Sequence, residues 1–226
     1  MQQALYTFMP NVIELFPDMI KALVETIVMV LISGSISTLI GIPIGIILVV
    51  TRPKNILENN LIYSIVGKII NVFRSIPFVI LLAAIIPFTR FIVGTTIGLK
   101  GAIVPLVLGA VPFVARQIES ALLDIDKGVI EAAQAMGSSP FEIIYRVLLK
   151  EGLPGIIYAL TITSVSLIGF SAVAGTVGGG GLGDFAIRYG YQYFKTDIMI
   201  ATIIILLILV NGIQSFGEFL LKRLSH

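Results

Sequence analysis

The chain has 226 residues, of which 57% are hydrophobic and 12% charged, and its formal net charge at pH 7 is +2. A typical soluble domain is about 25% charged, so this chain has too few charges to cover a globular surface; its mean hydropathy of +1.03 agrees. The small net charge does not favour nucleic-acid binding. The lack of cysteine excludes disulfides, and a single histidine, His226, makes a histidine-based metal or acid–base site implausible. These features predict an all-α membrane protein of one domain, residues 1–226, without a cofactor.

The N-terminus does not have the pattern of a cleavable signal peptide, which has a basic start followed directly by an apolar stretch. Acidic residues and prolines interrupt the first 25 positions, and the first lysine is Lys21. We therefore expect a short amphipathic segment that leads into the first membrane span and can lie on the membrane surface.

Five membrane spans are predicted, because about 20 apolar residues are needed to cross the ~30 Å hydrocarbon core as a helix. Three runs lack charge entirely: residues 26–51, 152–183 and 198–217. Two shorter runs, 75–89 and 101–115, become spans if their helices extend past the bordering charges. The expected spans are residues 22–50, 60–88, 99–121, 153–176 and 197–219.

Two details of these spans follow from single residues. Pro43 lies inside the first span and predicts a kink there, which membrane helices tolerate. At the end of the third span, Arg116 and Glu119 have the i, i+3 spacing of an ion pair on one helix face.

The distribution of Lys and Arg predicts the orientation. With the N-terminus outside, eight of these residues lie in inner segments and five in outer ones, while Lys68 and Arg74 belong to neither side. The excess on the inner side follows the positive-inside rule. It predicts a cytoplasmic C-terminus and a large cytoplasmic loop at about residues 122–152.

The loop contains signals for a first short helix. Asp126 is placed to cap a helix running to Met136, and Gly137 supplies the C′ residue that ends it. Alanines give this helix a small-residue surface that another protein can approach closely: Ala132, Ala133 and Ala135.

A second helix is predicted directly after the first. Ser139 opens it, with Pro140 at N1 and Glu142 at N3 in the arrangement of a capping box. A helix, a sharp glycine turn and another helix therefore follow one another. The alternative interpretation is an ordinary amphipathic loop that lies on the bilayer.

Glu131-Ala132-Ala133, followed three residues later by Gly137, resembles the cytoplasmic EAA loop of ABC-importer permeases. The family pattern continues as Ile-x-Leu-Pro, whereas this chain has Val147-Leu148-Leu149-Lys150, so Lys150 replaces the proline that helps to define the end of the second helix. Pro154, four residues on, is placed to begin the fourth span. The resemblance implies a coupling helix that sits in a cleft of the ATP-hydrolysing subunit. It assigns the coupling to Glu131, Ala132, Ala133, Gly137, Ser139, Pro140 and Glu142.

Further segments resemble a narrower family, the permease subunit of bacterial methionine ABC importers. They are Phe73–Phe78, Ile86–Arg90, Gly94–Leu99 and Gly179–Gly183, and the similarity covers nearly all of the chain after about Lys21. The resemblance implies a non-catalytic, homodimeric pathway subunit in the bacterial cytoplasmic (inner) membrane. Its partners would be two copies of a cytoplasmic ATP-binding subunit and an extracytoplasmic substrate-binding protein. Methionine is the expected substrate, and another small polar or amphipathic nutrient is the alternative.

Two groups of residues are candidates for the translocation path or gate. The fourth span places Thr161, Ser164 and Ser171 close to one face, with Ile168 between them. Hydroxyl groups in this pattern either hold helices together or line a path.

Arg74 and Pro77 form the other group of candidates. Arg74 is included because charges within a membrane face a cavity or reach the interface. Carbonyl groups freed by a helix break at Pro77 could bond its guanidinium, so a structural role is weighed beside substrate contact.

Three alternative functions fit the sequence less well. Gly178-x-Gly180-x-x-Gly183 matches the dinucleotide fingerprint formally, but that motif requires a preceding strand, and the chain has no P-loop sequence. We expect instead a flexible turn on the outer face. An ion-coupled transporter needs carboxylates or broken-helix ion sites near the midplane, whereas all thirteen acidic residues are predicted at span ends or in loops. A non-transporting membrane anchor would not explain the loop.

Overall fold

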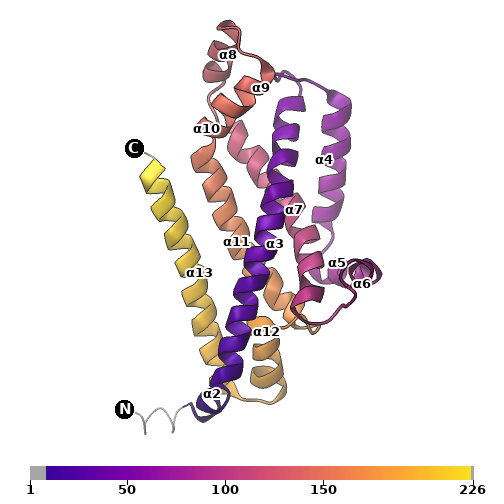
Figure 1. Ribbon diagram of the computed structural model, residues 1–226, viewed down its shortest axis with the longest axis vertical. Helices are drawn as coiled ribbons and strands as arrows, with labels where there is room; N and C mark the ends of the chain where they lie inside the picture. The colour runs from indigo at the N-terminus through magenta and orange to yellow at the C-terminus, as the bar shows by residue number, and fades with distance from the viewer. Residues whose placement is uncertain (1–8, 225–226) are drawn as a thin grey trace. The chain divides into compact units, whose positions relative to one another are not determined.

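The computed structural model describes residues 9–224, and these residues form helices and no strands. The expected all-α class is confirmed. The first eight residues of the expected amphipathic segment, and His226, lie outside the described part. The helices, with π-helices written η, are α2 (Pro10–Glu14), α3 (Phe16–Thr51), α4 (Asn60–Ser75), α5 (Phe78–Ala84), α6 (Ile86–Val93), α7 (Gly98–Leu123), α8 (Lys127–Ala135), α9 (Pro140–Glu142), η1 (Ile143–Leu148), α10 (Leu149–Glu151), α11 (Leu153–Gly175), α12 (Gly181–Phe185), η2 (Ala186–Gln192) and α13 (Thr196–Leu224) (Figure 1).

Within residues 9–224, four helices are long and apolar enough to cross a membrane: α3, α7, α11 and α13. The pair α4 and α5 makes a fifth candidate, but it is bent by 98° at its break. The sequence predicts a span at 60–88 with a helix break at Pro77, and the structure has a sharp break at that place. Its cause is Pro77, since the residue before a proline is pushed out of the helical region; Ile76 accordingly has φ −84° and ψ 122°.

The described chain divides into two compact units. Of the described residues, unit 1 comprises 9–35, 77–108 and 164–214, and unit 2 comprises 36–76, 109–163 and 215–224.

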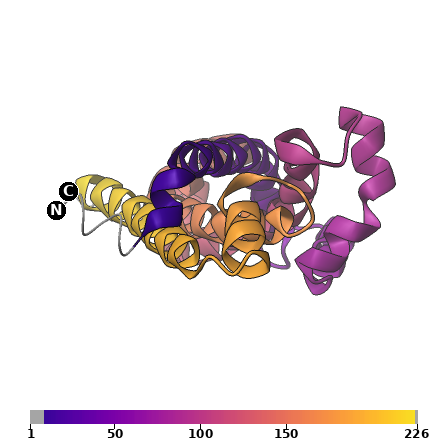
Figure 2. The same cartoon turned by 90° about the horizontal axis from the view of Figure 1, so that it is seen from below.

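In unit 1, α12 and η2 lie against the first turns of α3 and α13 (Figures 1 and 2). Their shared core is formed by Met19, Ala22, Leu182, Phe185, Ile198 and Ala201. A polar tie supports this core, because the Asn11 backbone N–H and side-chain amide donate to the Asp197 carboxylate at 3.0 and 3.1 Å.

In unit 2, α3 and α7 pack closely because glycines face α7. A Cβ placed on Gly41 would lie 2.6 Å from a Val114 side-chain carbon, and one on Gly45 would lie 2.7 Å from the Ile118 Cβ. This four-residue spacing of small residues lets two helix backbones approach closely, which is the main source of helix association in a bilayer. Around the contact lies a buried cluster: Val49, Val50, Val114, Ile118, Leu122, Leu148, Ile156 and Ala159.

We expect Gly45→Val to lower the thermal unfolding midpoint of the detergent-solubilised protein. The new side chain would meet the Ala115 carbonyl oxygen 2.8 Å from its Cβ, and overpacking of this kind costs about 1–3 kcal/mol. The matched control is Gly212→Val, because a Cβ at Gly212 has nothing within 4 Å. Equal unfolding midpoints for the two variants would contradict the close α3–α7 contact.

Candidate functional site

The first helix of the large loop, α8, has the two boundaries that the sequence predicts. Asp126 caps it, its carboxylate accepting from the Gly128 N–H at 2.7 Å. Met136 is the C-cap, and Gly137 follows with φ +80°, in the left-handed region. The Ser138 N–H donates to the Ala133 carbonyl at 3.1 Å, which closes the end of the helix.

The second helix starts with the expected capping box, which is confirmed. The Ser139 hydroxyl accepts from the Glu142 N–H at 3.4 Å, and the Glu142 carboxylate accepts from the Ser139 N–H at 2.9 Å. The same carboxylate accepts from the Ser139 hydroxyl. These bonds, the backbone one first and the hydroxyl one second, lower the pKa of Glu142 below its usual value. The junction between the two helices is therefore fixed by local hydrogen bonds.

The helical path then continues through η1 and α10 to Glu151 and ends at Gly152. Lys150 stands inside it, so the replacement of the usual proline lets the helix continue. Gly152 ends it at a crowded point, where a Cβ would lie 2.5 Å from a Leu122 methyl carbon. Pro154 lies in the first turn of α11.

The π-helix η1 anchors the loop to the buried core of unit 2, of which the loop is a part. Ile143 and Leu148 are both buried, although residues five apart on an α-helix point about 140° away from each other. The wider π-helix brings them to one side, and such segments are frequent at functional sites. Leu148 belongs to the same buried cluster as Ile118 and Leu122 of α7.

The opposite side of the loop exposes large apolar side chains. Met136 is 79% exposed, Phe141 75% and Tyr145 63%. Glu131 and Ala132 are exposed as well. Large apolar side chains exposed in a segment between spans make that segment a candidate interaction surface.

One loop residue differs from the prediction. Ala133 is 4% exposed, so it belongs to the inner face of α8 and not to the small-residue surface expected of it. The reason is helical periodicity, because Ala133 lies one turn from Ile130, which packs against the buried cluster of unit 2.

The candidates around the helix break are placed differently from one another. Pro77 is the N-cap of α5 and lies at the break. Arg74 is exposed on the last turn of α4. No hydrogen bond or ion pair of its guanidinium occurs within residues 9–224, so the expected bond to freed carbonyls is absent there.

On α11, the hydroxyl candidates bond to their own helix. Thr161 donates to the Ile157 carbonyl and Ser171 to the Ile168 carbonyl, each at 2.8 Å. Ile168 and Ser171 are 4% and 2% exposed. Burial of these two residues favours helix packing over an open lining at their positions; Ser164 is half-buried.

The glycine run at 178–183 forms a turn that is fixed by side chains of α3. The Gly181 N–H donates to the Glu25 carboxylate at 2.9 Å, and the Leu182 N–H donates to the Thr26 hydroxyl at 2.8 Å. The run follows α11 and not a strand, so it lacks the βαβ context of a dinucleotide site. Two anchoring bonds also distinguish it from the flexible turn that the sequence predicts.

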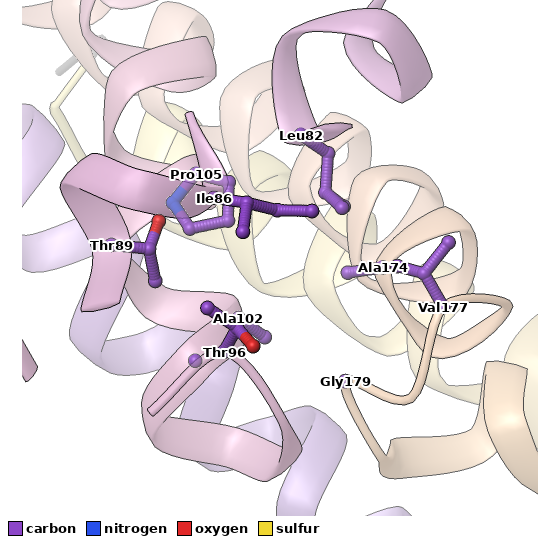
Figure 3. Close-up of a pocket in the computed structure, with 10 residues that line it drawn as sticks. Leu82, Ile86, Thr89, Thr96, Ala102, Pro105, Ala174, Val177 and Gly179 are labelled. Atoms are coloured by element: carbon purple, nitrogen blue, oxygen red, sulfur yellow. The ribbon is translucent and has the colours of Figure 1, made fainter. Parts of the chain in front are cut away.

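Two of the segments that carry the methionine-importer resemblance meet at this turn. The Gly98 N–H donates to the Gly178 carbonyl at 2.7 Å. Beside the contact lies a cavity of about 20 Å³. Among the residues that line it, Leu82 and Ile86 face Ala174 and Val177 (Figure 3). A cavity of this size holds about one water molecule, so it is too small for an amino acid.

A polar network on α4 and α7 was only partly predicted. The expected ion pair between Arg116 and Glu119 is present, with Arg116 also bonded to α4. Glu119 lies near the C-terminal end of α7, where the sequence predicts it, but it is 5% exposed, and this burial is not predicted. The pairing neutralises this carboxylate, so it does not resemble the free acid of an ion-coupled transporter.

The sequence model of a known protein family, described as "Binding-protein-dependent transport system inner membrane component", matches residues 41–226 of this chain. A probable D-methionine transport system permease protein of Vibrio cholerae is 52% identical over 202 residues, which are 89% of this chain and 90% of that protein. The D-methionine transport system permease protein of Escherichia coli is 52% identical over 157 residues, 70% of this chain and 72% of that one.

Among solved structures, a chain of the MetNI methionine ABC transporter in an inward-facing conformation is similar with a TM-score of 0.93. It is 46% identical, and the match covers 94% of this chain and 99% of that one. An amino acid ABC transporter crystallised with histidines matches with a TM-score of 0.78 at 19% identity, which shows a shared fold.

Proposed function

Because the chain belongs to the family of inner membrane components of binding-protein-dependent transport systems, we propose that it is the permease subunit of a methionine importer. The observation that carries the proposal is the loop from Asp126 to Glu151. It is anchored inside by Ile143 and Leu148, and it presents Met136, Phe141 and Tyr145 outward. The chain forms the pathway, and ATP is hydrolysed on a separate subunit.

The loop has the properties of a docking surface for a folded partner. Its two helix ends are fixed by Gly137 and by the Ser139–Glu142 capping box, so little conformational entropy is lost when a partner binds. Its exposed aromatic and methionine side chains are the types enriched in protein interfaces. The partner proposed for this surface is the cytoplasmic ATP-binding subunit, at Glu131, Ala132, Gly137, Ser139, Pro140 and Glu142.

The same family assignment supports the remaining partners. Two copies of the chain would pair with two ATP-binding subunits, and an extracytoplasmic protein would deliver the substrate. The similarity to a chain of the MetNI methionine ABC transporter, over 94% of this sequence, supports this assembly.

Methionine is proposed on the names of the relatives and on the character of the spans. Two of the hydroxyls of α11 bond to carbonyls of their own helix, and the charges of Arg116 and Glu119 are paired with each other. A path of this kind offers few charged groups that could bind both ends of a polar amino acid. It suits an apolar side chain, with selectivity supplied mainly by the binding protein.

The orientation proposed for the chain has the N-terminus outside and the C-terminus in the cytoplasm. The excess of Lys and Arg on the loop side supports it, as do Lys222 and Arg223 at the end of α13. The docking surface then faces the cytoplasm, where ATP is available.

The function is tested by uptake into proteoliposomes that contain the chain, its ATPase and its binding protein. We expect ATP-dependent methionine uptake, in which unlabelled methionine competes better than glutamine, histidine or a sugar. Transport of one of these without methionine uptake would refute the substrate. Uptake driven by an ion gradient without ATP would favour the ion-coupled alternative.

The coupling role of the loop is tested by Gly137→Val and Glu131→Lys. A side chain in the left-handed region costs about 1–2 kcal/mol, and the valine variant should misdirect α8, while the lysine variant inverts a charge on its exposed face. Both should assemble in the membrane and transport poorly. Gly137→Asn is the matched control, since asparagine tolerates this conformation. Normal uptake by both test variants at normal expression would disprove the coupling assignment.

The orientation is tested with single cysteines, which the cysteine-free chain makes unambiguous. A membrane-impermeant thiol reagent should label a cysteine at Gln192 from outside. It should label one at Ser138 only after the membrane is permeabilised. The reverse pattern would overturn the orientation together with cytoplasmic docking.

A further inference from the structure

Arg116 of α7 joins three groups in unit 2. It forms an ion pair with Glu119 on its own helix. Its other terminal nitrogen donates to the Gly67 carbonyl at 3.2 Å and to the Asn71 side-chain oxygen at 2.9 Å, both on α4. A Cβ at Gly67 would lie 3.4 Å from that nitrogen, which is a contact distance. One guanidinium therefore ties α4 to α7.

Apolar packing of α4 in unit 2 is sparse. Its buried residues are Gly67 and Ile70, and Ile70 shares a small buried cluster with Leu48 and Ala115. The other faces of α4 expose large apolar side chains: Leu61, Ile62, Ile65, Ile69 and Val72. In lipid, the small apolar contact around Ile70 holds α4 mainly by van der Waals packing. Packing of this kind permits α4 to slide along α7. The hydrogen bonds of Arg116 are directional, and they fix the register of α4 on α7.

The segment of α7 that carries Arg116 also carries the loop. Ile118 and Leu122 belong to the buried cluster that contains Leu148 of η1. A Cβ on Gly155, just after the loop, would lie 2.9 Å from the Ala121 Cβ. The last two turns of α7 thus contact the loop through apolar groups and α4 through Arg116.

We propose that Arg116 is a positioning residue that makes α4 follow the loop during the transport cycle, through its bonds to Asn71 and Gly67. The inference rests on the proposed function, in which the loop binds the ATPase. Movement of the loop shifts the end of α7 with it, because the two share one packed cluster. The guanidinium then carries α4 along, and the break after Ser75 lets α4 move as a separate helix. Arg116 suits this role because its charge is permanent and its donors form a planar, rigid fork.

The decisive variants change the acceptor on α4 and leave the ion pair of α7 intact. Asn71→Leu keeps the shape of the side chain and removes the acceptor oxygen, whereas Asn71→Asp keeps that oxygen. Arg116→Lys keeps the charge and loses the fork. Lys68→Met is the matched control, since it removes an exposed charge from α4 outside the network.

The readout is the number of methionine molecules transported per ATP hydrolysed in proteoliposomes. We expect Asn71→Leu and Arg116→Lys to hydrolyse ATP and to lower this ratio about fivefold or more. Asn71→Asp and Lys68→Met should stay within about twofold of the wild type. Paired spin labels at Ile65 on α4 and Gln134 on α8 give the second readout. In the wild type both labels should keep their separation on trapping with ATP and vanadate, while Asn71→Leu should change it.

Three results would overturn the proposal. The first is a ratio for Asn71→Leu equal to that of Lys68→Met. The second is a loss of transport in Asn71→Leu matched by an equal loss of ATP hydrolysis, which would make the network a structural staple. The third is an unchanged Ile65–Gln134 separation in Asn71→Leu. Failure of the wild-type chain to bind the ATPase would be distinguishable, because it would refute the proposed function itself.

Discussion

The burial of Leu148 beside Ile118 and Leu122 is the interaction on which the large loop depends. The loop has few other ways to hold its place, since α8 and α9 are only nine and three residues long and isolated helices of that length are marginal in water. Burying a leucine side chain contributes about 1.5–3 kcal/mol where the exposed alternative is water. This gain applies to a loop outside the bilayer. Within the spans, where lipid is as apolar as leucine, the glycine contacts between α3 and α7 have to supply close packing instead.

Polar groups within the spans follow a second constraint, because hydrocarbon offers them no water. Thr51, Thr161, Thr163 and Thr202 each donate their hydroxyl to a carbonyl four residues earlier in the same helix. Arg116 instead uses donors across two helices. A side chain that bonds to its own helix holds no second element, whereas Arg116 joins separate ones. This difference explains why few of the polar groups in the spans can act over a distance.

Local rules predicted the loop well and the long-range contacts poorly. The Asp126 cap, the glycine end at Gly137 and the Ser139–Glu142 box depend on residues within a few positions of one another, so their spacing is sufficient to predict them. The inward side of Ala133 depends on which face of α8 meets the core, which spacing alone does not give. Arg116 and Asn71 are 45 positions apart, and only the packing of α4 on α7 brings them together. The helix break at Pro77 follows from the proline itself, but the size of the bend does not, because a mild kink and a sharp break can share the same local sequence.

The segments that carry the narrow family resemblance have a structural task in this chain. Gly98 donates to the Gly178 carbonyl, and Thr89 and Thr96 line a cavity of about 20 Å³. These residues close the packing between the α6–α7 connection and the glycine turn, and they leave no room for an amino acid. Features that identify the family can therefore reflect how one end of unit 1 is built, and not direct recognition of substrate. This agrees with a division of labour in which an external protein selects the amino acid and the permease supplies a route of low polarity. The elaborate polar chemistry of the chain is then found where we propose that another protein docks, at the capped helices of the loop.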